Sequence, residues 1–380
     1  MTSELVKGFR DFTGEEAEKI AEIKKIILKN FEKYGFQPAE TPVIEHEDFV
    51  EGENGKDEAV SDIFKLKDRG KRSLALRYEF TFQLKRLMNN KKLPYKRYEM
   101  GPVFRDEPVS LNRLRQFTQC DVDIIGTSEI QTRDEAEILS LTDDILRELN
   151  IKHIILINSR KLLNEILDDL KIKNKREDIL REVDKFDKLS EKEIRENLKK
   201  LKAEKIIDAL KQKEDYFNKF EGYKDIISLI DYCRIYGMEV KFSPTLIRGL
   251  SYYNGMVFET KAEGIKETII AGGSYKFNDV QCTGISFGIE RLSIVSNVKL
   301  DKEKYLVVSL GEDRDSIKLA QKIRRENKEV SIFYGKPTKA LEYANSYKLN
   351  KVIFVGEKEV HSGKFKVKDM NSGKESDLKI

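Results

Sequence analysis

Three arginine-bearing segments with strand-like or sharply turned patterns could bind phosphate. Arg105 ends the segment YEMGPVF, Glu107 follows two residues later, and the polar stretch beyond them carries Arg113. A guanidinium at the end of a strand can grip a phosphate through two parallel hydrogen bonds. The pattern is equally compatible with an exposed hairpin that carries surface ion pairs.

Two further arginines lie in apolar or glycine-rich surroundings. Arg248, in TLIRGLSYY, stands between Ile247 and a Gly-Leu turn, where an unpaired guanidinium would be costly. Either an anionic ligand or a buried structural ion pair would satisfy it. Arg291 follows the two glycines of GISFGIERL, which allow a nucleotide to approach the backbone closely. Glycine-rich strand ends also occur without any ligand.

Acidic and amide side chains offer the complementary chemistry. Gln119, Asp121 and Asp123 share one face of a predicted strand, because side chains alternate along a strand. Together with Glu79 in LRYEFT they could accept hydrogen bonds from an amino group or an imidazole, or they could be exposed strand carboxylates. The sequence contains no GxxxxGK[ST] loop and no GxGxxG opening a helix. Any ATP would therefore be held by arginines and a sheet.

Composition excludes several other classes of site. The three cysteines form no CxxC pair and the three histidines are isolated, so a metal cluster or a disulfide framework is disfavoured and a cytoplasmic location is expected. No apolar run is long enough to cross a bilayer, so no membrane association is expected. The net charge of +4 over 380 residues permits a nucleic-acid partner without indicating one.

The predicted elements that would position these residues alternate between helices and hairpins. They are a helix over 15–34, an extended stretch around Pro38 and Pro42, a hairpin over 63–79, strands over 95–105 and 115–125, a helix over 129–149, strands over 256–260 and 267–271, and a strand running into a helix in TGISFGIERLSIV. Residues 158–231 are predicted to be helical, either as a bundle or as an inserted domain. From residue 304 the order β-α-β-α-β predicts a small α/β domain.

Taken in order, these segments resemble the class II aminoacyl-tRNA synthetases, and among them the histidyl-tRNA synthetase family. GFQPAETPVIE, with Pro42, is similar to the first class II motif, FRDE with Arg113 to the second, and GISFGIERL to the third. RGLSYY resembles the family's Arg-Gly-Leu-Asp-Tyr-Tyr, and AGGSYK its Ala-Gly-Gly-Arg-Tyr-Asp. The resemblance covers nearly the whole chain.

The resemblance implies an α+β fold: a class II synthetase catalytic domain with an antiparallel sheet and flanking helices, a helical insertion, and a C-terminal α/β anticodon-binding domain. The implied boundaries are 1–157 and 232–300 for the two parts of the catalytic domain, 158–231 for the insertion, and 301–380 for the anticodon-binding domain. This last domain looks shortened, because no closing helix is predicted after KFKVKD. The first motif implies a homodimer.

The implied activity is that of a histidine–tRNA ligase, which uses ATP and Mg²⁺ to form histidyl-adenylate and passes histidine to the 3′ end of tRNA(His). The resemblance assigns catalysis to Arg105 and Arg248; ATP binding to Arg105, Glu107, Arg113 and Arg291; and histidine binding to Glu79, Thr81, Gln119, Asp123, Arg248, Tyr252, Tyr253 and Tyr275. It assigns no protein ligand to the metal.

The chain departs from the family pattern in four places. LRYEFT differs from Leu-Arg-Pro-Glu-Gly-Thr around Glu79, EPVSLNR carries less charge than the usual second-motif loop, and Ser251 and Ser274 alter the two histidine-specific segments. One alternative is a non-catalytic, histidyl-tRNA synthetase-like regulatory paralogue, although such proteins usually lose RGLxYY or the motif arginines, which persist here. Another is a nucleic-acid-binding module without chemistry, which would need a strongly basic face.

Overall fold

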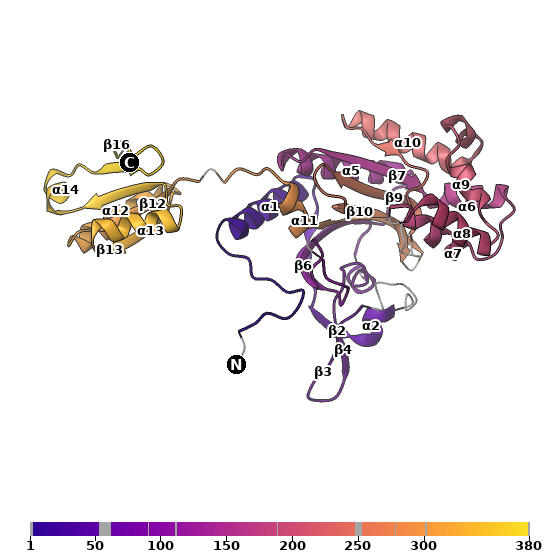
Figure 1. Cartoon of the computed structure of the whole chain (residues 1–380), viewed down its shortest axis with the longest axis horizontal. Helices are drawn as coiled ribbons and strands as arrows, with labels where there is room; N and C mark the ends of the chain where they lie inside the picture. The colour runs from indigo at the N-terminus through magenta and orange to yellow at the C-terminus, as the bar shows by residue number, and fades with distance from the viewer. Residues whose placement is uncertain are drawn as a thin grey trace. The chain divides into compact units, whose positions relative to one another are not determined.

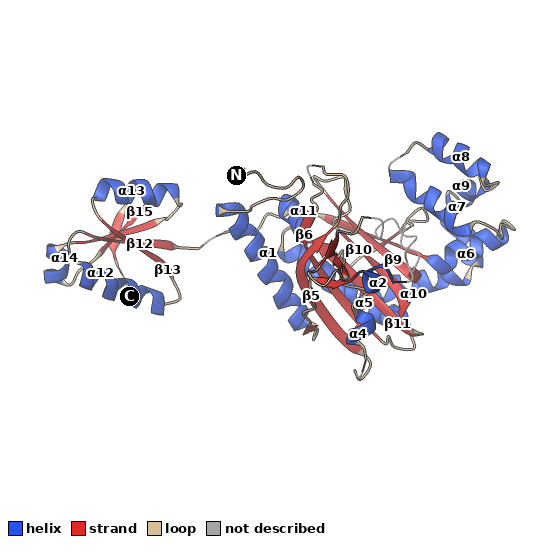
Figure 2. Cartoon of the chain, turned by 90° about the horizontal axis from the view of Figure 1, so that it is seen from below, coloured by secondary structure: helices blue, strands red, loops and turns tan. Residues whose placement is uncertain are grey.

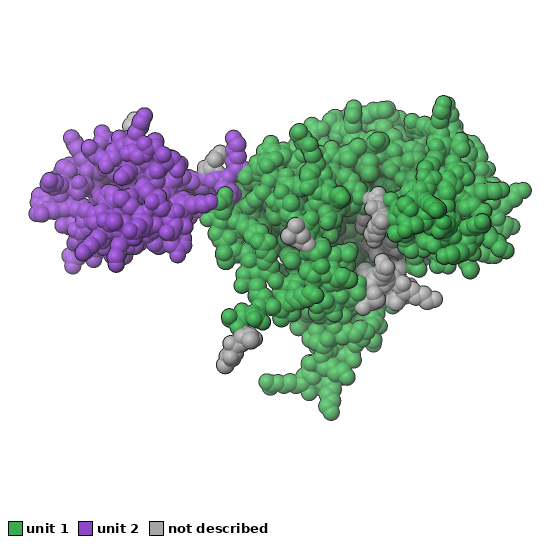
Figure 3. All heavy atoms as spheres, viewed as in Figure 1, with its two compact units in different colours: residues 1–298 green, residues 299–380 purple. Residues whose placement is uncertain are grey.

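The protein forms two compact units, residues 1–298 and residues 299–380 (Figure 3). The structure is a computed structural model, and each unit is described by itself. It describes residues 3–52, 62–89, 91–110, 112–187, 189–247, 253–277, 279–300 and 302–378. Within these ranges no helix is both long enough and apolar enough to span a membrane.

An eight-stranded sheet lies at the centre of the first unit (Figure 1). Its strands, in spatial order, are β1 (Gln37–Pro38), β5 (Tyr95–Phe104), β6 (Gln116–Ile125), β11 (Val280–Gly288), β10 (Ile270–Phe277), β9 (Tyr253–Ala262), β7 (His153–Ser159) and β8 (Lys241–Phe242). Neighbouring strands from β5 to β7 are antiparallel, whereas the two short edge strands run parallel to their neighbours. The antiparallel sheet predicted for the catalytic region is thus present.

Helices cover one face of this sheet. They are α1 (Gly14–Lys33), α5 (Gln131–Glu148), α10 (Glu221–Ile235) and the short α11 (Ile289–Val295). The predicted apolar face of α1, including Ile23, Ile27 and Phe31, is buried in the same cluster as the core residues of α5 and β6. Figure 1 shows α5 and α10 on one side of the sheet, with the small sheet β2-β4-β3 toward the other.

The small sheet carries the chain between the first two motif-like segments. Its strands are β2 (Ile44–His46), β3 (Lys65–Lys67) and β4 (Ser73–Leu76), accompanied by α2 (Glu47–Glu51) and α4 (Leu84–Leu87). The hairpin predicted over 63–79 is confirmed by the antiparallel pairing of β3 with β4. Because residues 77–83 follow β4 directly, this hairpin determines the position of Glu79.

The predicted helical tract consists of short helices rather than long ones. They are α6 (Arg160–Asp169), α7 (Arg176–Val183), α8 (Glu191–Lys200) and α9 (Lys205–Leu210), which precede α10. The apolar positions predicted at Leu180 and Val183 are buried. His153–Ser159 was not predicted to be a strand, yet this segment forms β7 and pairs with β9.

The second unit has a five-stranded sheet in the order β13-β12-β14-β15-β16. Its elements are β12 (Lys304–Ser309), α12 (Asp313–Arg325), β13 (Glu329–Tyr334), α13 (Pro337–Ser346), β14 (Lys351–Val355), α14 (Glu357–Ser362), β15 (Lys366–Asp369) and β16 (Glu375–Asp377). Alternate residues of β12 pack against α12 and α13, so the two helices cover opposite faces (Figure 2). The predicted parallel α/β arrangement is confirmed for β13, β12 and β14.

Candidate active site

The two faces of β6 have different chemistry. Cys120, Val122 and Ile124 are buried in the main apolar core beneath the helices. The alternate residues Gln119, Asp121 and Asp123 lie on the opposite face, as their spacing predicts, and all are nearly inaccessible to solvent. The structure therefore brings these three polar side chains to one buried surface.

Strand β5 adds charge to the same surface. In the antiparallel register Arg97 lies opposite Asp123, Glu99 opposite Asp121, and Gly101 opposite Gln119. Arg97 and Glu99 are both fully buried. Directly opposed residues on one face of a sheet are close enough to interact. The result is a buried ionic surface on the side of the sheet away from α1 and α5.

Three structural features hold the Asp123 carboxylate. The Tyr275 hydroxyl donates to one carboxylate oxygen, and Arg97 Nη2 lies 2.9 Å from the other. On the neighbouring strand, a Cβ on Gly284 would come within 2.0 Å of Asp123 Oδ1. Burial raises the pKa of Asp123, while Arg97 and the Tyr275 hydrogen bond oppose the rise.

Gln119 joins this carboxylate-rich region to Arg105, the first candidate phosphate ligand. Arg105 follows the end of β5, and its guanidinium donates to the Tyr78 carbonyl at 3.0 Å and to Gln119 Oε1 at 3.0 Å. It also lies over the Phe117 ring, 5.1 Å from the centroid. The Gln119 amide nitrogen in turn donates to both Asp121 oxygens, at 3.0 and 3.1 Å.

Two of the buried carboxyl groups share their environment. Burial raises the pKa of Glu79 to about 7, with nearby Asp121 adding to the rise and Arg105 opposing it. Burial and the neighbouring Asp123 raise the pKa of Asp121 to about 7 as well. Crowded carboxylates of this kind favour the entry of a cation, which would restore their charge.

Arg105 and Arg113 both lie close enough to Arg291 to repel its charge. Arg291 is positioned by donating to the Thr268 carbonyl at 2.9 Å and the Asn112 carbonyl at 3.4 Å. Its pKa is lowered first by burial and then by the charges of Arg113 and Arg105. Clustered guanidinium groups that are partly desolvated form a site for a polyanion.

Glu107, the predicted adenine ligand, is engaged with Arg113 in this structure. Arg113 Nε lies 2.6 Å from Glu107 Oε2, and the Arg113 side chain is half exposed. Arg115 Nε donates to the Glu107 carbonyl at 3.2 Å. The loop predicted to meet the nucleotide is thus held by ion pairs at its base.

The other predicted histidine ligands that the structure describes are Thr81, Tyr253 and Tyr275. Tyr253, at the start of β9, pairs with Tyr275 across the sheet, and a Cβ on Gly273 would come within 2.7 Å of the Tyr253 ring. Thr81 is buried in the turn that precedes α4. Arg248 and Tyr252 lie outside the described residues.

One further buried acidic residue was not predicted from the sequence. Glu135, on α5, is 1% exposed and accepts hydrogen bonds from the Ser274 hydroxyl and the Gln131 amide. Burial raises its pKa to about 7. Ser274 occupies the position at which the histidyl-tRNA synthetase pattern has arginine. The Glu135 carboxyl group therefore contacts a hydroxyl group at this position.

Replacing Glu135 by glutamine should make folding less sensitive to pH. The folded pKa of about 7 lies above the ordinary glutamate value of 4.5, so the wild type loses stability as pH rises from about 4.5 through 7. Between about pH 5 and pH 8, Glu135→Gln should gain about 2 kcal/mol relative to the wild type in free energy of unfolding. Urea denaturation at both pH values measures the free energy of unfolding of the two proteins. A difference between Glu135→Gln and the wild type that is the same at both pH values would contradict the prediction.

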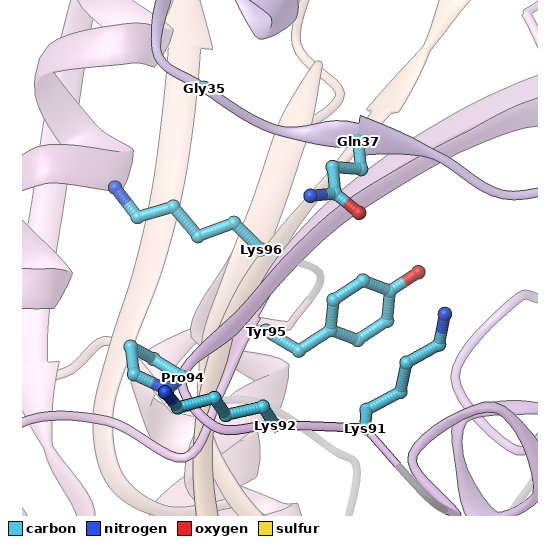
Figure 4. A pocket seen from close by; sticks show the side chains of 7 residues that line it. All are labelled: Gly35, Gln37, Lys91, Lys92, Pro94, Tyr95 and Lys96. Carbon is cyan, nitrogen blue, oxygen red and sulfur yellow. The ribbon is translucent and has the colours of Figure 1, made fainter.

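An open pocket of about 360 Å³ lies away from these residues (Figure 4). It is lined by Gly35, Gln37, Lys91, Lys92, Pro94, Tyr95 and Lys96. Tyr95 starts β5 and Arg105 follows its end, so the pocket lies at the opposite end of that strand from the arginines. None of the predicted site residues lines it, and the chemistry described above does not use it.

Comparisons with known proteins agree with this geometry. The sequence model described as histidyl-tRNA synthetase matches residues 8–292, and the model described as anticodon binding domain matches residues 304–380. The chain belongs to the histidyl-tRNA synthetase family. Among curated family members, histidine–tRNA ligase 1 of Bacillus cereus is 32% identical, with 99% of this chain and 95% of the relative covered. Histidine–tRNA ligase of Wolinella succinogenes is 31% identical, with coverages of 98% and 95%.

Solved structures show the same fold. Histidyl-tRNA synthetase from Nostoc sp. PCC 7120 superposes with a TM-score of 0.86 at 24% identity, covering 100% of this chain and 97% of that one. A Bacillus halodurans protein described as an ATP phosphoribosyltransferase regulatory subunit/histidyl-tRNA synthetase gives 0.78 at 22% identity, with coverages of 93% and 98%. The predicted α+β synthetase fold is thus confirmed.

Proposed function

We propose that this protein is a histidine–tRNA ligase that activates histidine with ATP and transfers it to the 3′ end of tRNA(His). The observation that carries the proposal is the position of Gln119, which accepts from Arg105 and donates to Asp121. Gln119 thus joins the arginine that we propose binds phosphate to the carboxyl groups that we propose bind a cation. An amino acid and ATP need this arrangement, since one supplies an ammonium group and the other a polyanion.

The arginine half is proposed to hold ATP. Arg105 is fixed by the Tyr78 carbonyl and Gln119, with its remaining hydrogen-bond donors free to meet the α-phosphate. Arg291 and Arg113 would take the outer phosphates, and their mutual repulsion is relieved when negative charge enters. Glu107 is proposed to accept a hydrogen bond from the adenine amino group, on the strength of the family resemblance.

The carboxylate half is proposed to hold histidine. Glu79 and Asp121 supply acceptors for the ammonium group, and Asp123 supplies one for the imidazole N–H. Thr81, Tyr253 and Tyr275 would complete the walls of this pocket. The family resemblance also assigns Arg248 and Tyr252 to the proposed histidine pocket.

Activation then joins the two substrates. A histidine carboxylate oxygen attacks the α-phosphorus, the bond from phosphorus to the bridging oxygen breaks, and pyrophosphate leaves with that electron pair. Arg105 offsets the charge that develops on the α-phosphate. Mg²⁺ is proposed to arrive as the counter-ion of ATP and to neutralise its phosphates. In the second step a ribose hydroxyl of tRNA attacks the carbonyl carbon of the adenylate, and AMP leaves.

The proposal is tested by amino-acid-dependent ATP–pyrophosphate exchange with each of the standard amino acids, followed by charging of tRNA(His). Histidine alone should support exchange, and histidine should become attached to the tRNA. Exchange with no amino acid, or better exchange with a different one, would refute the assignment. The regulatory alternative predicts no exchange, and the full-length relatives named as ligases favour the enzyme over it.

We further propose a cytoplasmic homodimer. Strand β1, in the segment resembling the first class II motif, is an edge of the large sheet, and Ile44 beyond it is 47% exposed. An edge strand is a template for pairing with a second copy. The three cysteines are free, as expected in a reducing compartment. Sedimentation at micromolar concentration should give a dimer, and a monomer there would refute the assembly. The domain boundaries at 158, 232 and 301 are also proposals.

A further inference from the structure

Arg97 is a buried cation that none of the roles above uses. It lies in the middle of β5, it is 0% exposed, and it is among the largest fully buried side chains of the described residues. A guanidinium in such a place is unfavourable unless acidic partners compensate for the lost hydration. Its partners therefore indicate why it is there.

One of those partners, Asp123, is proposed to line the histidine pocket. Arg97 Nη2 lies 2.9 Å from Asp123 Oδ2 and donates to the Phe80 carbonyl at 2.9 Å. Arg97 Nη1 lies 3.9 Å from Glu99 Oε2. Burial lowers the pKa of Arg97, but Asp123 and the other carboxylates around it outweigh that effect and leave the pKa raised. The guanidinium therefore stays charged.

The geometry leaves Asp123 little freedom. Arg97 approaches one carboxylate oxygen, the Tyr275 hydroxyl donates to the other, and the missing side chain of Gly284 leaves room for the group. Arg97 is the largest influence opposing the burial-driven rise in the pKa of Asp123. Without Arg97, the carboxyl group would retain a proton to higher pH and lose one of its two anchors.

We propose that Arg97 is a positioning residue for histidine activation, whose buried guanidinium keeps the Asp123 carboxylate ionised and correctly oriented for the substrate's imidazole. This inference rests on the proposed function. It makes Arg97 a determinant of affinity for histidine but not for ATP. A purely structural ion pair would instead affect folding, or both substrates alike.

The first experiment compares Arg97→Met with Arg77→Met. Arg77 is a matched control, because it is buried in the same network and pairs with Glu99 at 3.1 Å but forms no hydrogen bond or ion pair with Asp123. Arg97→Met should raise KM for histidine by about thirtyfold or more, as expected when a buried charge loses its partner. KM for ATP should change by no more than about twofold. Equal changes in the two KM values, or a histidine-specific change in Arg77→Met as well, would overturn the proposal.

The pH dependence of kcat/KM for histidine distinguishes the loss of the Arg97 charge from the loss of its packing. In Arg97→Met the acid limb of kcat/KM for histidine should move to higher pH, since Asp123 now loses its proton at higher pH. Arg97→Lys keeps a cation and should return the limb toward the wild-type position. An unmoved limb in the methionine variant would overturn the proposal.

A double variant covers the case in which Arg97→Met fails to fold. Arg97→Met/Asp123→Asn removes both charges together, and its KM for histidine should lie within about twofold of that of Asp123→Asn alone. A further large increase would show that Arg97 acts elsewhere. Carboxyl-carbon NMR of the ligand-free wild type, Arg97→Met and Arg97→Lys proteins follows the titration of Asp123 without catalysis, and Asp123→Asn identifies the Asp123 resonance. If the wild type supports no exchange, the proposed function fails, whereas an Asp123 titration that is unchanged in Arg97→Met refutes the role of Arg97.

Discussion

Arg105→Ala is expected to reduce histidine-dependent ATP–pyrophosphate exchange by about a hundredfold to a thousandfold. Arg105 is held by one backbone carbonyl and by Gln119, so its guanidinium is oriented before ATP arrives. Removing a preorganised donor at a phosphate that gains charge directly raises the activation barrier. The exchange rate at saturating histidine and ATP measures the effect.

Two comparisons sharpen this result. Arg105→Lys should recover little activity, because an ammonium group cannot reproduce a planar fork that meets Gln119 and phosphate together. Arg72→Ala provides the control, since Arg72 lies on the β3–β4 hairpin, is 70% exposed and pairs with Asp68. A folded Arg105→Ala protein with a near-wild-type exchange rate would remove Arg105 from the mechanism.

Gly284→Ala is expected to raise KM for histidine by about tenfold to a hundredfold, together with a loss of about 1–3 kcal/mol in the free energy of unfolding. The added Cβ would come within 2.0 Å of Asp123 Oδ1 and 3.1 Å of the Val122 carbonyl. The carboxylate cannot simply swing aside, because Arg97 and Tyr275 hold its two oxygens. It must therefore leave the orientation proposed to receive the imidazole.

Thr283→Ala is the matched control for that substitution. Thr283 neighbours Gly284 on β11, and its side chain points to the opposite face of the sheet. Its replacement should alter stability while leaving KM for histidine near the wild-type value. Steady-state exchange kinetics and chemical denaturation of both variants test the pair, and a wild-type KM for histidine in Gly284→Ala would contradict the geometry.

The parts of the site that follow local rules could be predicted from sequence. Strand periodicity alone placed Gln119, Asp121 and Asp123 on one face, and the structure confirms it. The apolar spacing of α1 likewise predicted its buried face. The roles of the individual site residues stay predictions, because the structure shows their positions and contacts without a substrate.

The parts that depend on distant segments could not be predicted. In KRYEMG the alternating charges of Arg97 and Glu99 read as solvent-exposed, and only pairing with β6 and coverage by residues 77–83 buries them. Glu135 meets Ser274 across a separation of 139 residues, which no local pattern encodes. Strand β7 was missed for a related reason, because its short apolar run directly precedes a helical tract.

Glu99 also restricts the motion of the backbone at Thr41. One of its oxygens accepts hydrogen bonds from the Thr41 amide at 2.9 Å, the Thr41 hydroxyl at 2.6 Å and the Arg77 guanidinium at 3.1 Å. Thr41 lies outside every helix and strand, in a segment that would ordinarily exchange its amide hydrogens quickly with water. Here the Thr41 amide is held by a buried ionic cluster, so we expect it to exchange only when that cluster opens, as slowly as the amides of the sheet beside it.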